Sequence, residues 1–365
     1  MVLQFFYKSL FHIIDTYTTI FQHFFLLLYL FYNFFDIMFV GVKIMEHYFF
    51  YIQNFVDLSY SETNNIDHLD ISTKFQNSLK ENFTDDHLVD LLIYAGYIPD
   101  LYPSDSSQET LYSKLIEVLV CEWAQRMNFN SNFVKQKASF EDVTIFIDGK
   151  AIVCDAKSFR LGRSQKAPNV KDFLKLEDIR KWLSRHKNKL GGLVTYPCRH
   201  EWTSSSDAYQ YCTTKDAPTL MLPYKYLAFL LKYKNNYKTN NLKNLWNYNK
   251  LFPHILKKNI PTGNKAAYWN TINKEILKIT NIDKNTFDKF MNYSENLINQ
   301  CIQANLEILK SQKDFIIKNI LTDINGINDI NVLKKQIISY RTAAETQYVD
   351  NLISRIQNFR MDENS

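Results

Sequence analysis

Two aspartates and a lysine have a spacing that could support chemistry, within the segment EDVTIFIDGKAIVCDAKSFR. Two β-branched, apolar runs in this segment flank Asp148-Gly149, and Asp-Gly is the sequence signal for a two-residue hairpin turn. That turn would place Asp142 directly opposite Asp155, with Cβ atoms about 4.5–5.5 Å apart. Lys157 follows two residues after Asp155 and is therefore expected on the same face of the hairpin.

A pair of facing carboxylates destabilises a sheet unless something compensates the repulsion. A divalent cation between them would do so, and hard oxygen ligands with room for water and phosphate suit Mg²⁺. A lysine beside such an ion can orient or help deprotonate a water molecule. The pattern thus indicates hydrolysis of a phosphodiester. The alternative is a structural hairpin, in which Lys157 neutralises Asp155 and Asp142 caps a strand end.

The surrounding sequence predicts the elements that must hold this hairpin. Apolar residues at helical spacing predict helices over 84–97 and 109–127, with Thr84 as an N-cap. A further helix is expected over 171–186, a strand over 190–196, and a strand followed by a helix over 220–231. Residues 268–359 are mostly helical in spacing. The predicted class is α/β, with a mixed central sheet flanked by helices. We expect an N-terminal helical part over 55–125, a catalytic α/β core over 126–260, and a helical C-terminal part over 261–365 that could make dimer contacts.

Charge is distributed unevenly along the 365 residues, although the net charge is only +5. Residues 56–105 carry a net charge of −8, residues 155–189 a net charge of +7, and residues 224–258 contain eight lysines and no acid. Such asymmetry suggests a surface that meets an anionic polymer; a solvated helical face is the alternative. With 46% hydrophobic and 22% charged residues, the composition excludes a wholly disordered chain, a collagen and a polytopic membrane protein.

Five cysteines are present, and none of them forms a C-x-x-C pair. This odd number argues against a disulfide framework and favours a reducing compartment. We therefore expect a cytoplasmic protein.

The first 45 residues differ from the rest of the chain. Thirteen of the 27 phenylalanines lie within the first 55 residues, and a charge-free run of 20 residues separates Asp15 from Asp36. That run is long enough to cross a bilayer. A misplaced start, with Met45 beginning the ordinary sequence, is favoured over a membrane anchor or a buried aromatic helix. We expect this hydrophobic leader, residues 1–45, to lie outside the fold.

Three segments beyond the bare D-x-K string resemble the HindIII restriction endonuclease family of the PD-(D/E)xK nuclease superfamily. The resemblance is carried by DAKSFRLGRSQKAPNVKDF (155–173), SSQETLYSKLIEVLV (106–120) and YQYCTTKDAPTLMLPYKYLAFLL (209–231). It extends from about residue 70 to LTDINGINDINVL (321–333) and excludes the first 45 residues. Glu141 stands where the superfamily pattern has proline.

The resemblance implies a restriction-endonuclease-like fold and a type II restriction endonuclease that cuts duplex DNA with Mg²⁺. Asp142, Asp155 and the backbone carbonyl of Ala156 would be metal ligands, and Lys157 would be the catalytic lysine. Many relatives add a glutamate from the helix before the hairpin. Glu117 is the first choice, with Glu109 and Glu122 as alternatives.

The same resemblance implies a palindromic target, AAGCTT if the base-reading residues are shared. A palindrome matches a two-fold homodimer, and a cognate DNA methyltransferase encoded nearby would protect the host. The basic residues that follow the site would contact DNA, mostly at phosphates; they are Arg160, Arg163, Lys166 and Lys171. The alternatives are a non-sequence-specific or repair nuclease of the same fold and a non-catalytic DNA-binding protein.

Overall fold

A computed structural model describes residues 43–62, 66–133, 139–161, 173–197, 212, 214, 216–251, 267–325 and 330–357. The chain divides into two compact units, Met1–His47 and Tyr48–Ser365, and the sheet and the site lie in the second. The hydrophobic leader expected at residues 1–45 lies outside the described residues up to residue 42.

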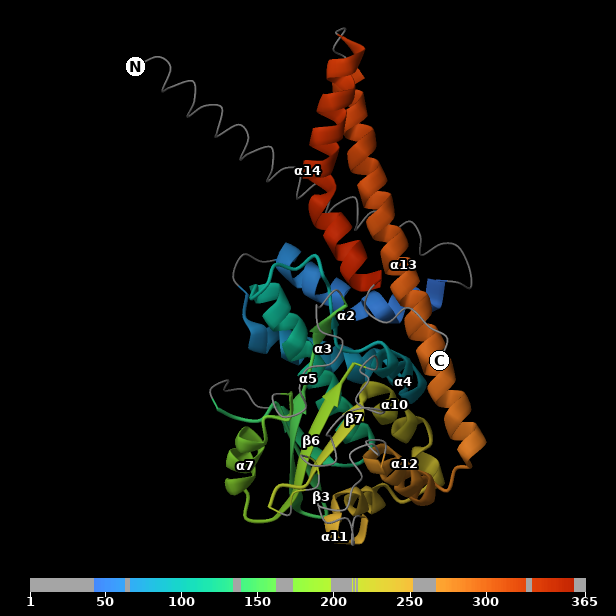
Figure 1. Cartoon of the computed structure of the whole chain (residues 1–365). Coiled ribbons are helices and arrows are strands. Elements are labelled where there is room, and N and C mark those ends of the chain that lie inside the picture. The colour runs from blue at the N-terminus through green and yellow to red at the C-terminus, as the bar shows by residue number, and fades with distance from the viewer. Residues whose placement is uncertain are drawn as a thin grey trace. The chain divides into compact units, whose positions relative to one another are not determined.

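A five-stranded mixed sheet forms the centre of the second unit (Figure 1). Its strand order is β2-β3-β4-β6-β7; the first three strands are antiparallel neighbours, and β4, β6 and β7 run parallel. A small parallel pair, β1 with β5, adjoins the end of β4. The predicted α/β class with a mixed central sheet is confirmed. The strands are β1 (Tyr97–Ile98), β2 (Asn130–Phe133), β3 (Val143–Ile147), β4 (Lys150–Ala156), β5 (Phe159–Arg160), β6 (Lys189–Tyr196) and β7 (Thr219–Pro223).

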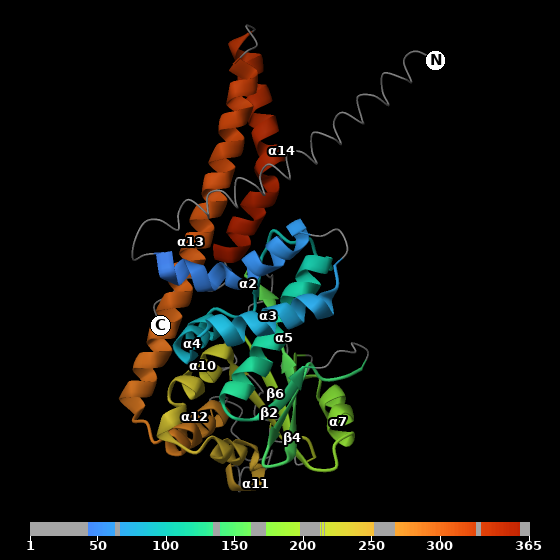
Figure 2. The same cartoon turned by 180° about the vertical axis from the view of Figure 1, so that it is seen from behind.

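Helices cover both faces of this sheet (Figures 1 and 2). On one face, Leu193 of β6 lines the same small apolar cavity as Trp123 of α5 (Ser107–Arg126) and Leu227 of α10 (Tyr224–Lys232). On the other face, a Cβ at Gly192 would lie 2.8 Å from Cγ2 of Ile179 in α7 (Leu176–Ser184). Burial of both faces explains why β4, β6 and β7 are almost continuously apolar rather than alternating.

The remaining helices flank this core. Thr84 caps α4 as expected, because its hydroxyl accepts the N–H of His87 at 3.2 Å. The two longest helices, α13 and α14, pack against each other. These elements are α2 (Lys43–Glu62), α3 (His68–Asn82), α4 (Asp85–Ile93), the 3-10 helices η1 (Lys234–Asn236) and η2 (Thr239–Trp246), α11 (Tyr248–Leu251), α12 (Ala267–Thr280), α13 (Lys284–Asn325) and α14 (Asn331–Gln357).

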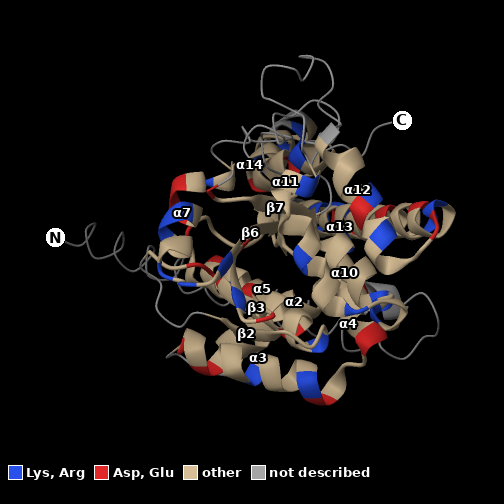
Figure 3. Ribbon diagram, turned by 90° about the horizontal axis from the view of Figure 1, so that it is seen from below, with Lys and Arg blue, Asp and Glu red and all other residues tan. Residues whose placement is uncertain are grey.

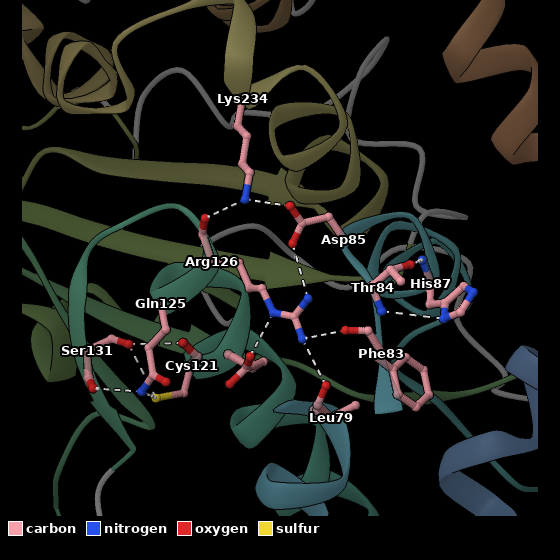
Figure 4. A network of polar contacts seen from close by, with 11 residues as sticks. Leu79, Phe83, Thr84, Asp85, His87, Cys121, Gln125, Arg126, Ser131 and Lys234 are labelled. Atoms are coloured by element: carbon pink, nitrogen blue, oxygen red, sulfur yellow. Dashed lines mark hydrogen bonds and ion pairs between the residues drawn. The ribbon is translucent and has the colours of Figure 1, made fainter. Parts of the chain in front are cut away.

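Arg126, at the end of α5, joins three helices through its guanidinium group (Figure 4). Its Nη2 donates to the carbonyl oxygens of Leu79 and Phe83 at the end of α3, both at 2.8 Å. Its Nε donates to Glu122 Oε1 at 2.9 Å, and its Nη1 donates to Asp85 Oδ1 at 3.1 Å. These bonds place α3 and α4 against α5, the helix that packs on the β3–β4 hairpin.

Acidic and basic segments compensate each other within the fold. Asp85, from the acid-rich stretch 56–105, pairs with Lys234 at 2.5 Å, and Lys243 pairs with Asp148 at 2.5 Å. Lys225 is buried and pairs with Glu295 of α13. Figure 3 accordingly shows basic and acidic positions interspersed along the helices. The lysine-rich stretch 224–258 is therefore partly an internal counterpart of acidic residues elsewhere.

Among the residues that the structure describes, no helix combines the length and apolar character needed to cross a bilayer.

Replacing Arg126 by methionine should destabilise the fold. The change leaves the Glu122 carboxylate, whose side chain is 3% exposed, without its partner, and breaking a buried ion pair in this way costs about 3 kcal/mol. Arg180→Met is the matched control, because Arg180 pairs with the exposed acids Glu177 and Asp216 and should cost less than about 1 kcal/mol. Urea unfolding measures both; equal losses would contradict the role given to Arg126.

Candidate active site

The hairpin that carries the two aspartates has the predicted register. β3 and β4 pair from Val143 opposite Cys154 to Ile147 opposite Lys150. The turn residues Asp148 and Gly149 have φ values of 50° and 71°. A type I′ turn requires positive φ at both positions, so Asp-Gly sets the register locally. The prediction of the turn and of these five pairs is confirmed.

At the start of β3, Asp142 departs from the regular ladder. Its backbone N–H donates to the Cys154 carbonyl at 3.0 Å. Its side-chain Oδ2 accepts the N–H of Ala156 at 2.9 Å, so a carboxylate takes the place of a backbone acceptor. The regular pairing therefore ends at Val143, one residue earlier than predicted. The hydrogen bond directs the Asp142 carboxylate toward the C-terminal end of β4.

Asp155 and Lys157 lie at that same end of β4. The Lys157 Nζ is 2.6 Å from Asp155 Oδ2, and the two side chains are 19% and 8% exposed. The ammonium also lies over the Phe173 ring, 6.0 Å from its centre. Because β4, β6 and β7 are parallel, their carboxyl ends meet at one edge of the sheet, where ligands of open α/β sheets are usually bound.

The electrostatics of the site disfavour two free carboxylates. Burial, followed by the charge of Asp155, raises the pKa of Asp142 to about 7. Burial and the charges of Asp142, Asp155 and Glu117 also raise the pKa of the Cys154 thiol well above its ordinary value. In the described part of the chain, no three His, Cys, Asp or Glu side chains gather as a ready-made metal cage. Two neighbouring carboxylates suit Mg²⁺, which usually keeps several waters and takes one or two protein carboxylates.

Each of the three glutamates considered from sequence has an ion-pair partner. Glu117 pairs with Lys114 and is 8% exposed, and its charge acts on Cys154, the neighbour of Asp155. Glu109 pairs with Arg160 at 2.8 Å, and Glu122 pairs with Arg126. The choice of Glu117 as a member of the site stays a prediction.

Arg160, expected from the sequence to contact DNA, makes several hydrogen bonds within the protein. Its Nη1 donates to the carbonyl oxygens of Pro99 at 3.2 Å and Tyr102 at 2.7 Å, and its Nη2 donates to Glu109 Oε2 at 2.8 Å. These bonds join the loop before α5 to β5. A contact between Arg160 and a DNA phosphate stays a prediction. Arg163, Lys166 and Lys171 lie outside the described residues.

Sequence reasoning missed two parts of the site. Lys114 pairs with Glu117, and its positive charge partly opposes the rise in the pKa of Asp142. From sequence, however, a Lys-x-x-Glu pair on a helix resembles an ordinary surface pair. Glu141 is buried and accepts from Thr144 Oγ1 at 2.9 Å and lies 3.1 Å from His186 Nε2. Glu141 thus anchors the start of β3 to the end of α7. Because His186 is 45 residues away in the chain, the local sequence did not indicate this contact.

A mixed sheet that presents Asp142, Asp155 and Lys157 at one end of a hairpin defines a nuclease of the PD-(D/E)xK class. Comparison with known proteins agrees. The family model for the HindIII restriction endonuclease matches residues 51–339. The chain is 27% identical over 258 residues to the type II restriction enzyme HindIII of Haemophilus influenzae, an alignment that covers 67% of this chain and 82% of the relative. The chain belongs to the HindIII restriction endonuclease family. It is a type II site-specific deoxyribonuclease, and it acts on double-stranded DNA.

The raised pKa of Asp142 predicts a pH-dependent stability in the metal-free protein. The unfolded carboxyl ionises near pH 4, whereas the folded one keeps its proton until about pH 7. The folded state therefore binds more protons between these values and loses stability as pH rises. Asp142→Asn removes this loss. The free energy of unfolding of the variant, relative to that of the wild type, should therefore be higher at pH 8 than at pH 5 by at least about 1.4 kcal/mol, the equivalent of one pKa unit.

Urea unfolding in EDTA at the two pH values measures this gain. Asp216→Asn is the control, because Arg180 lowers the pKa of Asp216 and its contribution is constant above pH 5. If the free energy of unfolding of Asp142→Asn differs from that of the wild type by the same amount at pH 5 and pH 8, the raised pKa of Asp142 is contradicted.

Proposed function

We propose that this restriction endonuclease hydrolyses phosphodiester bonds of duplex DNA at the palindrome AAGCTT in a Mg²⁺-dependent reaction. The observation that carries the proposal is the Asp142–Asp155 pair with Lys157 at 2.6 Å from Asp155, held at the carboxyl edge of the sheet. The identity to HindIII across most of that enzyme supports the inherited target.

Asp142, Asp155 and the backbone carbonyl of Ala156 would hold the Mg²⁺ ion. When bound, the ion would activate water and stabilise the charge of the leaving oxygen. Three features together hold the two carboxylates at one place: the hairpin turn, the hydrogen bond from the Ala156 N–H to Asp142 and the β4–β6 ladder. Glu117 would assist from α5, where its ion pair with Lys114 fixes the carboxylate behind the hairpin.

Lys157 supplies positive charge at the point where a phosphate must approach two acids. Its Nζ lies beside Asp155 and over the Phe173 ring, so the ammonium has an anionic and an aromatic partner. A positive group here lowers the repulsion between DNA and the acidic pair and can orient the attacking water by a hydrogen bond from Nζ. Arg163, Lys166 and Lys171 follow in sequence and would contact DNA phosphates.

A homodimer is the assembly that fits a palindromic site, since each subunit would read one half and cut one strand. The helical C-terminal part is the proposed contact region. Its helix α14 exposes Ile337 and Tyr340, at 40% and 77% of their surfaces, and a dimer contact there would cover these side chains. A DNA methyltransferase encoded nearby would be the functional partner that protects host sites. In the part of the chain that the structure describes, four buried cysteines are free thiols, which suits a reducing, cytoplasmic location.

Digestion of a plasmid with one AAGCTT site tests the proposal. The full chain should give one linear product with Mg²⁺, no product with EDTA, and no cut in a plasmid whose site carries a single base change. Lys157→Ala and Asp155→Asn should reduce the cleavage rate more than 1,000-fold, of the order expected for groups at the reacting phosphate, while DNA affinity in Ca²⁺ stays within a few-fold. Lys80→Ala, an exposed lysine of α3, is the control and should cut normally.

Other outcomes of the same digestion identify the alternatives. Products without fixed ends would indicate a non-specific or repair nuclease, and discrete fragments from another site would reject the AAGCTT target alone. Binding with no cleavage by the wild type would contradict the nuclease proposal and favour a DNA-binding protein.

A further inference from the structure

Lys157 occupies a junction between two sheets. β4 ends at Ala156, and β5 begins at Phe159, so Lys157 belongs to neither strand. Its N–H donates to the Thr195 carbonyl of β6 at 2.8 Å, and two residues later the Phe159 N–H donates to the Gly96 carbonyl at 2.8 Å. The position of this lysine therefore depends on contacts made where two ladders meet.

Tyr224 supplies the hydrogen bond to the carbonyl oxygen of Lys157. The Tyr224 hydroxyl donates to it at 2.9 Å, although 67 residues separate the two in sequence. Tyr224 is 0% exposed and is the first residue of α10, directly after β7. The register explains the encounter: Ala156 pairs with Thr195, and Thr195 pairs with Leu222, so β4 and β7 end at the same level of the sheet.

Gly96 leaves the space in which the Tyr224 ring lies. A Cβ on Gly96 would stand 2.7 Å from Cε2 of Tyr224 and 3.1 Å from the Lys157 carbonyl oxygen. Gly96 also has a φ of 87°, a conformation that other residues adopt rarely. The close approach of three backbone segments and one ring thus depends on the missing side chain.

We propose that Tyr224 is a positioning residue for Lys157. Its hydroxyl holds the backbone of Lys157, and thereby holds the ammonium group on Asp155 and in line with the reacting phosphate. A buried carbonyl that loses its donor would move toward another partner, and small displacements of reacting groups lower rates strongly. The inference rests on the proposed catalytic role of Lys157 and goes beyond it, because Tyr224 touches neither DNA nor metal in this scheme.

Tyr224→Phe tests this role, since it removes one hydroxyl and keeps the ring. Tyr237→Phe is the matched control: the Tyr237 hydroxyl also donates to a backbone carbonyl at 2.9 Å, that of Leu230 in α10, away from the site. Both variants lose one partly buried hydrogen bond from a hydroxyl to a backbone carbonyl, so their losses of stability in urea unfolding should be similar.

Single-turnover cleavage of a duplex containing AAGCTT, with saturating full-length enzyme and Mg²⁺, separates the two variants. Tyr224→Phe should lower the rate constant about tenfold, equivalent to about 1.4 kcal/mol, with the Kd for DNA in Ca²⁺ within twofold of wild type. Tyr237→Phe should leave both quantities within twofold. A merely structural role for Tyr224 would not split rate from affinity in this way.

A wild-type rate constant for Tyr224→Phe would overturn the inference while leaving the proposed function intact. An inactive wild type would overturn both, and it is read in the same experiment. Urea unfolding identifies a temperature at which wild type, Tyr224→Phe and Tyr237→Phe are all folded, and the rates are compared there. Equal rate constants for the two variants at that temperature also overturn the inference.

Discussion

The repulsion between Asp142 and Asp155 is the constraint on which the rest of the structure depends. Burial, followed by the charge of Asp155, raises the pKa of Asp142 to about 7, and holding the two carboxylates together costs stability in the absence of a cation. Three features of the fold nevertheless hold the two carboxylates together: the Asp-Gly turn, the β4–β6 ladder and the hydrogen bond from the Ala156 N–H to the Asp142 side chain. Such an opposition between stability and local charge is typical of functional sites.

The surrounding helices bring compensating charge to this point. α5 carries Lys114, whose ammonium pairs with Glu117 and partly opposes the rise in the pKa of Asp142. α5 is in turn fixed by Arg126 to the carbonyl oxygens at the end of α3 and by Glu109, through Arg160, to β5. Glu109 and Arg126, near the two ends of α5, thus determine where the middle of this helix meets the hairpin.

Local features of the sequence were enough to predict the hairpin and much of the fold. The Asp-Gly turn fixes five cross-strand pairs without reference to distant residues, and Thr84 caps its helix through a neighbour three residues away. Contacts between distant segments were beyond such reasoning. The hydrogen bonds of Arg160 to the Pro99 and Tyr102 carbonyls could not be predicted, because these partners are about 60 residues earlier in the chain. Tyr224 lay in a segment that resembles the family, but its bond to Lys157 follows only from the order of the parallel strands.

Direct measurement of divalent-ion binding is the sharpest test of the central claim that the two aspartates form a metal site. Titration with Mn²⁺, a paramagnetic ion that also accepts oxygen ligands, can be followed by electron paramagnetic resonance on the full chain. Asp142→Asn and Asp155→Asn should each weaken binding at least tenfold, and Asp216→Asn, at an exposed carboxylate, should leave it unchanged. Binding that is equally strong in the wild type and in the Asp142→Asn/Asp155→Asn double variant would contradict the account.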